Sequence, residues 1–560
     1  MLKTRRGLTA TRTDGTADAE GVDPTRALVT VAVLLGIVIR AAHVLRSGFP
    51  LNDGGLFYQM ARDLQANGFR LPATTTYNDA GLPFAYPPLA FYLAGLLDSF
   101  SPIGLMTWFR ILPLLMTALT VIAFAALART MLSNRAARIV AVFAFAVLPR
   151  SFIWMLMGGG VARSIGLLCA ILALQQCYLL YRRRALRYAP LATLFCALTV
   201  LSHLETGWFL SYSIALFFLF NGRHRAGTLG SVAITLGTVV LTAPWWGAVV
   251  KVHGVAPFLA AHATGGSVIT DESIRTYLVV TLLRLGQGYT SETLFPVVGS
   301  LAVLGLLACV VRRRWLLPVW WAQIILMDVR AFPTYASLPI AMLAGIGVAE
   351  LLVPALRAVA GSGRGGPLLP HHLTSPAVAL ALGGVLVLSA ATAMSTDQRL
   401  GGENTFLVPL SPDERAAMRW VAAETPPASQ FLLVTAGIWP ADKQSEWFPV
   451  LAHRSSVATV QGYEWERGGV FARRVAAYDE IQVECAIQEL ACLERWTEEH
   501  AIPFTHVYVP NTPRGQCCWR LRQSLARDQR FREVFAGPGA SIFARRTSDS
   551  ETVPGVAHDR

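Results

Sequence analysis

The sequence predicts a polytopic α-helical membrane protein with a C-terminal α/β domain outside the membrane. Apolar residues make up 53% of the 560 residues and charged residues only 15%, whereas soluble domains carry about 25% charged residues. Apolar runs close to the ~20 residues that cross a bilayer recur up to residue 394, where the composition changes. These observations exclude a soluble enzyme, a fibrous protein and a disordered scaffold.

The membrane part is predicted from the apolar runs in chain order. Residues 1–26 are polar and are expected to form a disordered cytoplasmic tail. About eleven spans of near-bilayer length follow and make residues 27–395 the transmembrane domain. They are 27–45, 104–128, 139–157, 164–181, 188–204, 207–220, 229–250, 294–311, 315–329, 332–353 and 376–393.

Two large outer loops are expected, at 46–103 and 251–293. Each contains an apolar stretch, 87–100 in the first and 277–288 in the second. Both stretches are too short to cross and are expected to lie at the membrane surface.

The net charge of +13 comes from arginine, and its placement predicts the orientation. Short loops rich in Arg mark the cytoplasmic face, so we expect a cytoplasmic N-terminus and an extracytoplasmic C-terminal domain in the cell membrane. A nucleic-acid partner is not expected, because basic and aromatic residues do not interleave on one surface. The loop arginines are Arg129, Arg135, Arg138, Arg182, Arg183, Arg184, Arg187, Arg223, Arg225, Arg312, Arg313, Arg314, Arg357 and Arg364.

Residues 396–547 are expected to form the outer α/β domain, followed by a disordered tail at 548–560. Ser411 before Pro412, with Glu414 three residues on, predicts a helix start with a capping box. Strands are predicted at 431–435, 456–460, 505–509, 531–536 and 540–545, and helices near 470–500 and 516–527.

The eight cysteines divide evenly between the two parts. Four lie in spans and are expected to pack as small apolar residues. The other four lie in the outer domain, where disulfides form. We expect the segment with Cys485 and Cys492 to pair with Cys517 or Cys518, with the connectivity left open.

Polar side chains in or beside membrane spans are costly and indicate function. Under this topology they gather on the outer side. They are Asp53 in the first loop, Arg163 after Gly158-Gly159-Gly160, His203 and Glu205 at a turn, His253 and Arg284 in the second loop, and Arg330 in a tight turn.

The early loop Asp53, together with Phe84-Ala85-Tyr86-Pro87-Pro88, resembles the GT-C membrane glycosyltransferases. It is most similar to the protein O-mannosyltransferase and aminoarabinose-transferase branch. The segments Gly158–Gly166, His203–Glu205 and Arg330–Pro339 fit the same branch. The resemblance covers roughly residues 27–395 and implies a GT-C-like transmembrane domain.

The resemblance implies transfer of a sugar from a polyprenyl-phosphate carrier to an exoplasmic acceptor hydroxyl on a protein, lipid or polysaccharide. Asp53 is then the general base of an inverting reaction. Arginines would meet the charge on the leaving phosphate, and the candidates are Arg163, Arg284 and Arg330. The residues expected to bind substrate are Tyr58, Tyr86, His203, Glu205, His253, Trp447 and Trp465.

No cofactor is assigned, and a requirement for a divalent metal stays open. Glycines follow Asp53 where the branch often has a second acid, so no Asp-x-Asp pair is present. His203, Glu205, His253 and His262 are suitable ligand types, but their spacing matches no recognised metal motif. In the outer domain, Trp447 and Trp465 lie beside carboxylates, a combination that suits sugar stacking; core packing is the alternative.

The residues proposed for the site also have alternative structural roles. Asp53 is alternatively a helix N-cap, Arg163 a lipid-headgroup contact, and Arg330 a partner of Asp328. His203 and Glu205 alternatively bond only to each other. A transporter or flippase-like protein, or a non-catalytic protein that binds lipid-linked sugars, is the alternative function.

Overall fold

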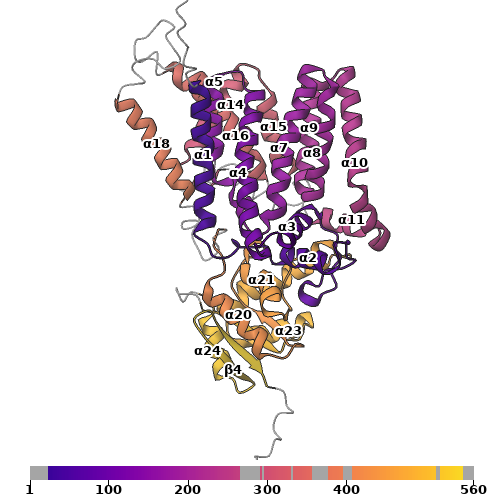
Figure 1. Ribbon diagram of the computed structural model, residues 1–560. Coiled ribbons are helices and arrows are strands. Elements are labelled where there is room, and N and C mark those ends of the chain that lie inside the picture. The colour runs from indigo at the N-terminus through magenta and orange to yellow at the C-terminus, as the bar shows by residue number, and fades with distance from the viewer. Residues whose placement is uncertain are drawn as a thin grey trace, which may run out of the picture.

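The computed structural model describes residues 23–264, 290–292, 295–328, 332–355, 376–394, 407–511 and 517–546. Within these ranges a bundle of long helices stands on a smaller α/β domain (Figure 1). The bundle helices are α1 (Pro24–Leu45), α4 (Leu105–Met131), α5 (Arg135–Val147), α7 (Gly160–Arg183), α8 (Ala189–Ser202), α9 (Leu204–Phe217), α10 (Arg225–His253), α14 (Val297–Val311), α15 (Leu316–Met327), α16 (Phe332–Gly347) and α18 (Pro376–Met394).

The protein is a multi-pass membrane protein. In the described part of the chain, five helices are long and apolar enough to cross a bilayer, or six if one bent pair counts as a span. Other predicted spans are apolar helices of 10–17 residues, including α14 and α15. The predicted count of about eleven therefore stays a prediction.

Three shorter helices lie at the end of the bundle nearest the C-terminal domain (Figure 1). They are α2 (Gly55–Ala66), α3 (Leu89–Phe100) and α11 (Ala256–Ala263). Helix α3 corresponds to the stretch expected at the membrane surface. The second such stretch, 277–288, lies outside the described residues.

The span expected at 139–157 is wrong as a single helix. Helix α5 ends at Val147 and is followed, after a bend of 78°, by the short helix α6 (Ile153–Leu156). Pro149 causes the break, because proline lacks an N–H and disfavours helical backbone in the residue before it. The buried Arg40 of α1 binds the broken end, donating to the Ala146 carbonyl at 2.9 Å and to the Ser151 hydroxyl at 2.8 Å. The break carries the chain into the turn before α7.

The C-terminal domain contains a five-stranded sheet of order β2-β1-β3-β5-β4. Strand β1 pairs in parallel with β2 and β3, while β5 is antiparallel to β3 and β4. The strands are β1 (Gln430–Leu433), β2 (Ser455–Ser456), β3 (His506–Pro510), β4 (Phe531–Ala536) and β5 (Ala540–Arg545). The helices are α20 (Pro412–Glu424), α21 (Lys443–Ala452), α22 (Val470–Asp479), α23 (Leu490–His500) and α24 (Trp519–Arg527).

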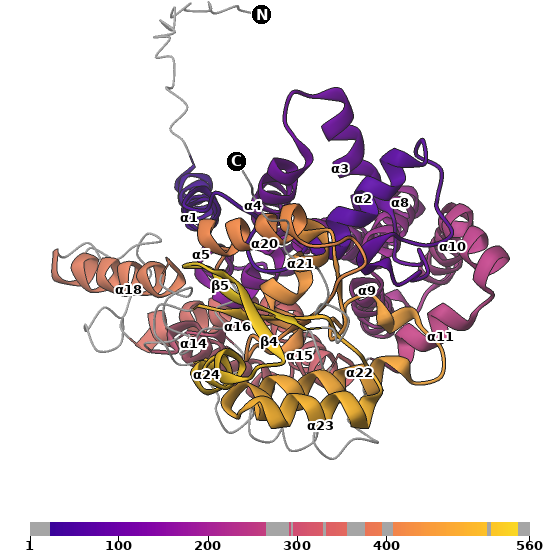
Figure 2. The same cartoon turned by 90° about the horizontal axis from the view of Figure 1, so that it is seen from below.

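Helices cover both faces of this sheet, with α20 and α21 on one side and α23 and α24 on the other (Figure 2). Alternate residues of β1 reach the two cores: Phe431 packs in the cluster that contains Phe448 of α21, and Leu432 in the cluster that contains Leu493 of α23. A strand that is buried on both faces has a continuous run of apolar residues in its sequence, and Phe431–Val434 is such a run. The cluster on the α21 side extends into the first outer loop and into α4 and α7.

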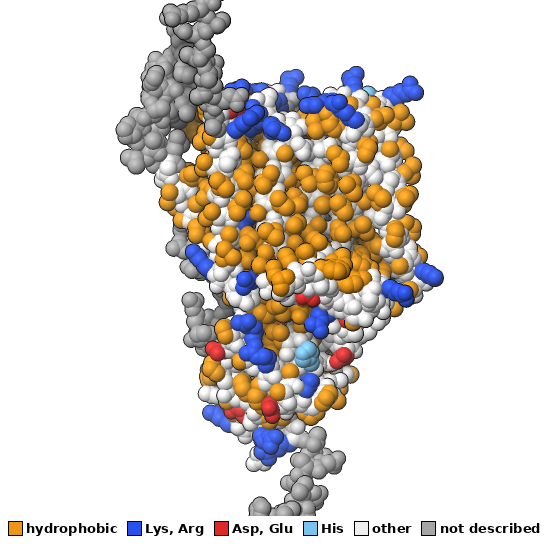
Figure 3. All heavy atoms as spheres, in the orientation of Figure 1, with side chains coloured by type: hydrophobic (Ala, Val, Ile, Leu, Met, Phe, Trp, Pro, Cys, Tyr) orange, Lys and Arg blue, Asp and Glu red, His pale blue; other side chains and the backbone are white. Residues whose placement is uncertain are grey.

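The surface of the bundle is divided into an apolar middle and a basic end. Apolar side chains cover the middle of the bundle, and Lys and Arg gather at the end away from the C-terminal domain (Figure 3). The C-terminal domain and the first outer loop therefore share the end opposite the basic one.

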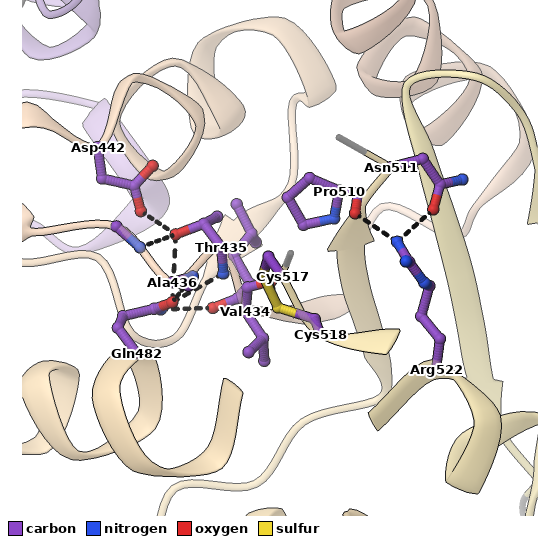
Figure 4. Close-up of a disulfide and its surroundings, with 12 residues drawn as sticks. Val434, Thr435, Ala436, Asp442, Gln482, Pro510, Asn511, Cys517, Cys518 and Arg522 are labelled. Carbon is purple, nitrogen blue, oxygen red and sulfur yellow. Dashed lines mark hydrogen bonds between the residues drawn. A yellow bond between two sulfur atoms is a disulfide. The ribbon is translucent and has the colours of Figure 1, made fainter. Parts of the chain in front are cut away.

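The disulfides differ from the expected pairing. Cys485 bonds to Cys492, and Cys517 bonds to the adjacent Cys518. Each bond joins two cysteines of the same segment, whose Cα atoms lie 5.3 Å and 3.7 Å apart. Figure 4 shows the second disulfide beside Val434 at the end of β1. The four remaining cysteines are buried and free, in agreement with the packing role predicted for them.

Candidate active site

The Asp53 loop, residues 50–55, lies at the junction of the bundle and the C-terminal domain. Its backbone is left-handed at Asn52 (φ 51°) and at Gly54 (φ 121°), conformations that Asn tolerates and Gly adopts freely. Gly54, rather than Asp53, is the N-cap residue of α2. The Asp53 side chain is therefore not a cap of that helix.

The Asp53 carboxylate points instead at the start of α7. Its Oδ1 accepts a hydrogen bond from the Gly159 amide at 2.7 Å, and its Oδ2 pairs with Arg163 Nη2 at 2.7 Å. The two side chains are only 11% and 9% exposed. A buried charge pair of this kind is costly to form, and removing one partner costs more than removing both. The pair is therefore a candidate for a chemical role as well as a structural one.

Glycines at the turn before α7 make this approach feasible. A Cβ added at Gly158 would lie 2.1 Å from the Asp53 carbonyl oxygen, and one at Gly159 would lie 2.8 Å from Asp53 Oδ2. The Gly158 amide in turn donates to the Leu51 carbonyl at 2.7 Å. The amides of Gly158 and Gly159 thus both bind the Asp53 loop.

Arg163 is held in place by two further contacts. Its Nε donates to the Trp154 carbonyl at 3.1 Å, and its guanidinium carbon lies 4.7 Å from the centroid of the Trp154 ring. Its Nη1 makes no hydrogen bond within the part of the chain that the structure describes. The Nη1 group of the fork thus remains for an anionic ligand.

A second carboxyl, Glu446 of α21, joins the loop from the C-terminal domain. Its Oε1 accepts from the Gly54 amide at 2.8 Å. Burial, followed by the Asp53 charge, raises the pKa of Glu446 to about 8. From the sequence, Glu446 is only the carboxylate next to Trp447; its contact with the Asp53 loop was not predicted.

Tyr86 is central to the electrostatics of the site. Burial of its hydroxyl raises the pKa of Tyr86 above its ordinary value, and the nearby charges of Arg163, Glu205, Glu464 and Asp53 act on the same hydroxyl. Asp53, Arg163 and Glu205, predicted separately from the sequence, thus all affect the pKa of the Tyr86 hydroxyl.

Of the other side chains predicted to bind substrate, some lie near Tyr86 and others have structural contacts. Trp465 meets Tyr86 at 5.8 Å between ring centroids and is buried in an aromatic cluster with Trp245. His203 caps α9, where its Nδ1 pairs with the hydroxyl of Thr206 at 2.9 Å. The partner of His203 Nδ1 at this turn is therefore Thr206, and not Glu205 as the structural alternative had it.

Tyr58 and Trp447 pack together, with ring centroids 5.9 Å apart. Trp447 is fully buried, so its ring offers no face to a sugar in this structure. His253 Nε2 contacts the Ala73 carbonyl at 2.7 Å and ties the end of α10 to the first loop. Arg284 and Arg330 lie outside the described residues.

One potential metal-binding group is found in the described residues. Glu480, Glu499 and His500 have ligand atoms within 4.8 Å of one another. They lie in the C-terminal domain, where His500 and Glu480 form a half-exposed pair at 2.8 Å. His203, Glu205, His253 and His262 form no such group there.

Taken together, a multi-pass bundle, short helices at its end and an α/β domain enclose a buried carboxylate–guanidinium pair. The fold is that of the GT-C glycosyltransferases, which the resemblance in the sequence had indicated. No protein-family model and no curated protein sequence matches the chain.

Two solved structures show the shared fold. The oligosaccharyltransferase of Archaeoglobus fulgidus in its apo form superposes with a TM-score of 0.55 at 14% identity, covering 87% of this chain and 69% of that one. ArnT from Cupriavidus metallidurans bound to undecaprenyl phosphate gives 0.52 at 14% identity, covering 93% and 98%. Identity at this level establishes similarity of fold.

Proposed function

We propose that this protein is a membrane glycosyltransferase that moves a sugar from a polyprenyl-phosphate-linked donor to an acceptor hydroxyl on the exoplasmic side. The GT-C fold supports the class of enzyme, and the solved ArnT structure holds undecaprenyl phosphate. Basic loops at the end of the bundle away from the C-terminal domain support an exoplasmic position for that domain.

The observation that carries the proposal is the buried Asp53–Arg163 pair at 2.7 Å, at the end of the bundle that carries the C-terminal domain. Glycosyl transfer from a lipid phosphate needs two groups close together. A carboxylate must take the proton of the acceptor hydroxyl, and a cation must meet the charge on the leaving phosphate. We assign the first role to Asp53 and the second to Arg163.

In the proposed reaction the acceptor oxygen attacks the anomeric carbon as its proton passes to Asp53. The bond from the anomeric carbon to the phosphate oxygen breaks, and its electron pair stays on the phosphate. Both Asp53 oxygens already accept one hydrogen bond, but a carboxylate offers about four lone-pair sites, so room for the hydroxyl remains. A single displacement at the anomeric carbon inverts its configuration.

Arg163 has two tasks in this scheme. Its Nη2 fixes the Asp53 carboxylate, and its Nη1 is the donor left for the phosphate. Arg284 and Arg330 stay further candidates for phosphate binding. Tyr86 and Glu205 are the proposed contacts to sugar hydroxyls, because the Glu205 charge acts on the buried Tyr86 hydroxyl near Asp53 and Arg163.

The test is sugar transfer by purified protein in detergent from a panel of polyprenyl-phosphate sugars, with envelope lipids, polysaccharides and proteins as acceptors. Asp53→Asn is compared with Asp79→Asn, an exposed Asp in the same outer loop. We expect wild type and Asp79→Asn to turn over and Asp53→Asn to lose at least about 100-fold in rate. Donor binding without turnover would favour transport or sensing instead. Absence of donor binding would refute the proposal.

A further inference from the structure

The position of the Asp53 carboxylate depends on how the Asp53 loop is held. Within the bundle, the turn before α7 supplies Gly158, Gly159 and Arg163, as described above. A second set of contacts comes from a part of the chain almost 400 residues away.

This second set belongs to the C-terminal domain and binds the residues on both sides of Asp53. The Asn52 amide donates to the Val408 carbonyl at 3.2 Å. The Asn52 carbonyl accepts from Trp447 Nε1 at 2.8 Å, and the Gly54 amide donates to Glu446 Oε1 at 2.8 Å. The peptide groups before and after Asp53 are therefore both fixed by another domain.

The contact around Glu446 is close-packed. A Cβ added at Gly55 would lie 2.3 Å from the Glu446 carbonyl oxygen, which also accepts from the Tyr77 hydroxyl at 2.7 Å. Glu446 is 8% exposed and Trp447 is fully buried. The carboxyl of Glu446 also faces the first amides of α2, where a helix favours an acceptor or a negative charge.

We infer that Glu446, with Trp447 beside it, is a positioning residue that the C-terminal domain supplies to hold the Asp53 carboxylate in its reactive place. The inference rests on the proposed function. Its physical basis is that fixing the peptide groups on both sides of Asp53 fixes the direction of the side chain. A misplacement of about 1 Å at a reacting group costs on the order of 100-fold in rate.

The same geometry makes the site sensitive to the protonation of Glu446. The groups that face it are Asp53 from the loop, Arg163 from α7 and Tyr77 from the short turn Tyr77–Asp79. With a pKa of about 8, Glu446 is neutral at lower pH and gains a charge beside Asp53 as the pH rises through that value. Two like charges repel, so we expect the rate to fall on the alkaline side.

The experiment measures kcat, donor KM and the pH–rate profile for Glu446→Gln and Glu446→Ala. Glu484→Gln, an exposed glutamate of the same domain, is the control. Glu446→Gln keeps an acceptor and stays neutral, so it is expected to retain kcat within about threefold below pH 7 and to lose the decline near pH 8. Glu446→Ala is expected to lose about 100-fold in kcat, with little change in donor KM.

Hydrogen exchange of the peptide that contains residues 50–56 supplies a readout that does not need turnover. We expect faster exchange in Glu446→Ala and wild-type protection in Glu446→Gln. Wild-type kcat or wild-type loop protection in Glu446→Ala would overturn the inference. So would an unchanged alkaline decline in Glu446→Gln, a variant chosen to fold even if Glu446→Ala does not.

Failure of the proposed function is a separate result. Wild-type protein that transfers no sugar from any donor would refute the enzyme and, with it, the catalytic part of this inference. The exchange measurement would still decide whether Glu446 holds the Asp53 loop.

Discussion

Alanine at Gly158 tests how closely the turn before α7 must approach the Asp53 loop. The added Cβ would lie 2.1 Å from the Asp53 carbonyl oxygen and 3.2 Å from Pro50 Cβ. An ordinary contact needs 3.4 Å or more, so the two backbones must separate by more than 1 Å. Neither neighbour is the end of a flexible side chain, and the strain therefore cannot be relieved by a change of rotamer.

The size of the effect follows from this displacement. Inserting a methyl group into a packed site costs about 1–3 kcal/mol, and loss of the hydrogen bond from Gly158 to Leu51 adds about 1 kcal/mol. A displacement of about 1 Å at the Asp53 carboxylate is expected to lower kcat on the order of 100-fold. That factor corresponds to about 2.7 kcal/mol of transition-state free energy at about 1.36 kcal/mol per tenfold.

The assay is initial-rate sugar transfer, normalised to protein that elutes as a single folded species in detergent. Gly48→Ala is the matched control, because it lies shortly before the same loop and an added Cβ there meets nothing within 4 Å. We expect Gly48→Ala to keep the wild-type rate. Equal rates for Gly158→Ala and Gly48→Ala would refute the argument that close approach at Gly158 sets the position of Asp53.

Three further predictions follow from the site and its supporting domain. Arg163→Lys is expected to lower kcat at least about tenfold, because a single ammonium cannot reproduce the guanidinium fork that reaches Asp53 and the neighbouring carbonyl; kcat and donor KM are the measurements. Glu446 has a pKa of about 8 in the folded state and 4.5 as its ordinary value, so the folded state holds an extra proton between these values. Stability is therefore expected to fall as the pH rises from about 4.5 to about 8, and Glu446→Gln to abolish this slope in thermal unfolding measured against pH. The double variant Cys485→Ser with Cys492→Ser is expected to lower stability by about 2.5 kcal/mol through loss of the small closed loop, as measured by denaturant unfolding of the full chain under non-reducing conditions.

Features that are local in sequence were predicted from the sequence. The capping box at Ser411 and Glu414 is present in the structure, and strands β4 and β5 lie at the predicted positions. Helix α21 was not predicted. Its ten residues contain Pro449 and two aromatic residues, and this pattern was interpreted as a sugar-binding segment and not as a helix. The signal that marks its start is Asp442, whose side chain accepts from the first amides of the helix.

Pairings between distant residues could not be predicted. Asp53 and Arg163 were each identified because charges beside membrane spans are costly, yet nothing in the sequence pairs two residues 110 positions apart. Glu446 lies 392 positions from Gly54, and no local pattern distinguishes it from other glutamates in the domain. The cysteine pairing was wrong for a related reason, because spacing alone does not reveal which segments fold back on themselves.

The long separation between Asp53 and Glu446 has a consequence for biosynthesis. A ribosome completes the first outer loop early, but the part of the chain that locks the loop is made only after every helix of the bundle has been synthesised. A nascent or truncated chain that ends after α18 would be membrane-embedded without an organised Asp53 loop. If the proposed function holds, activity would then begin only with the finished polypeptide.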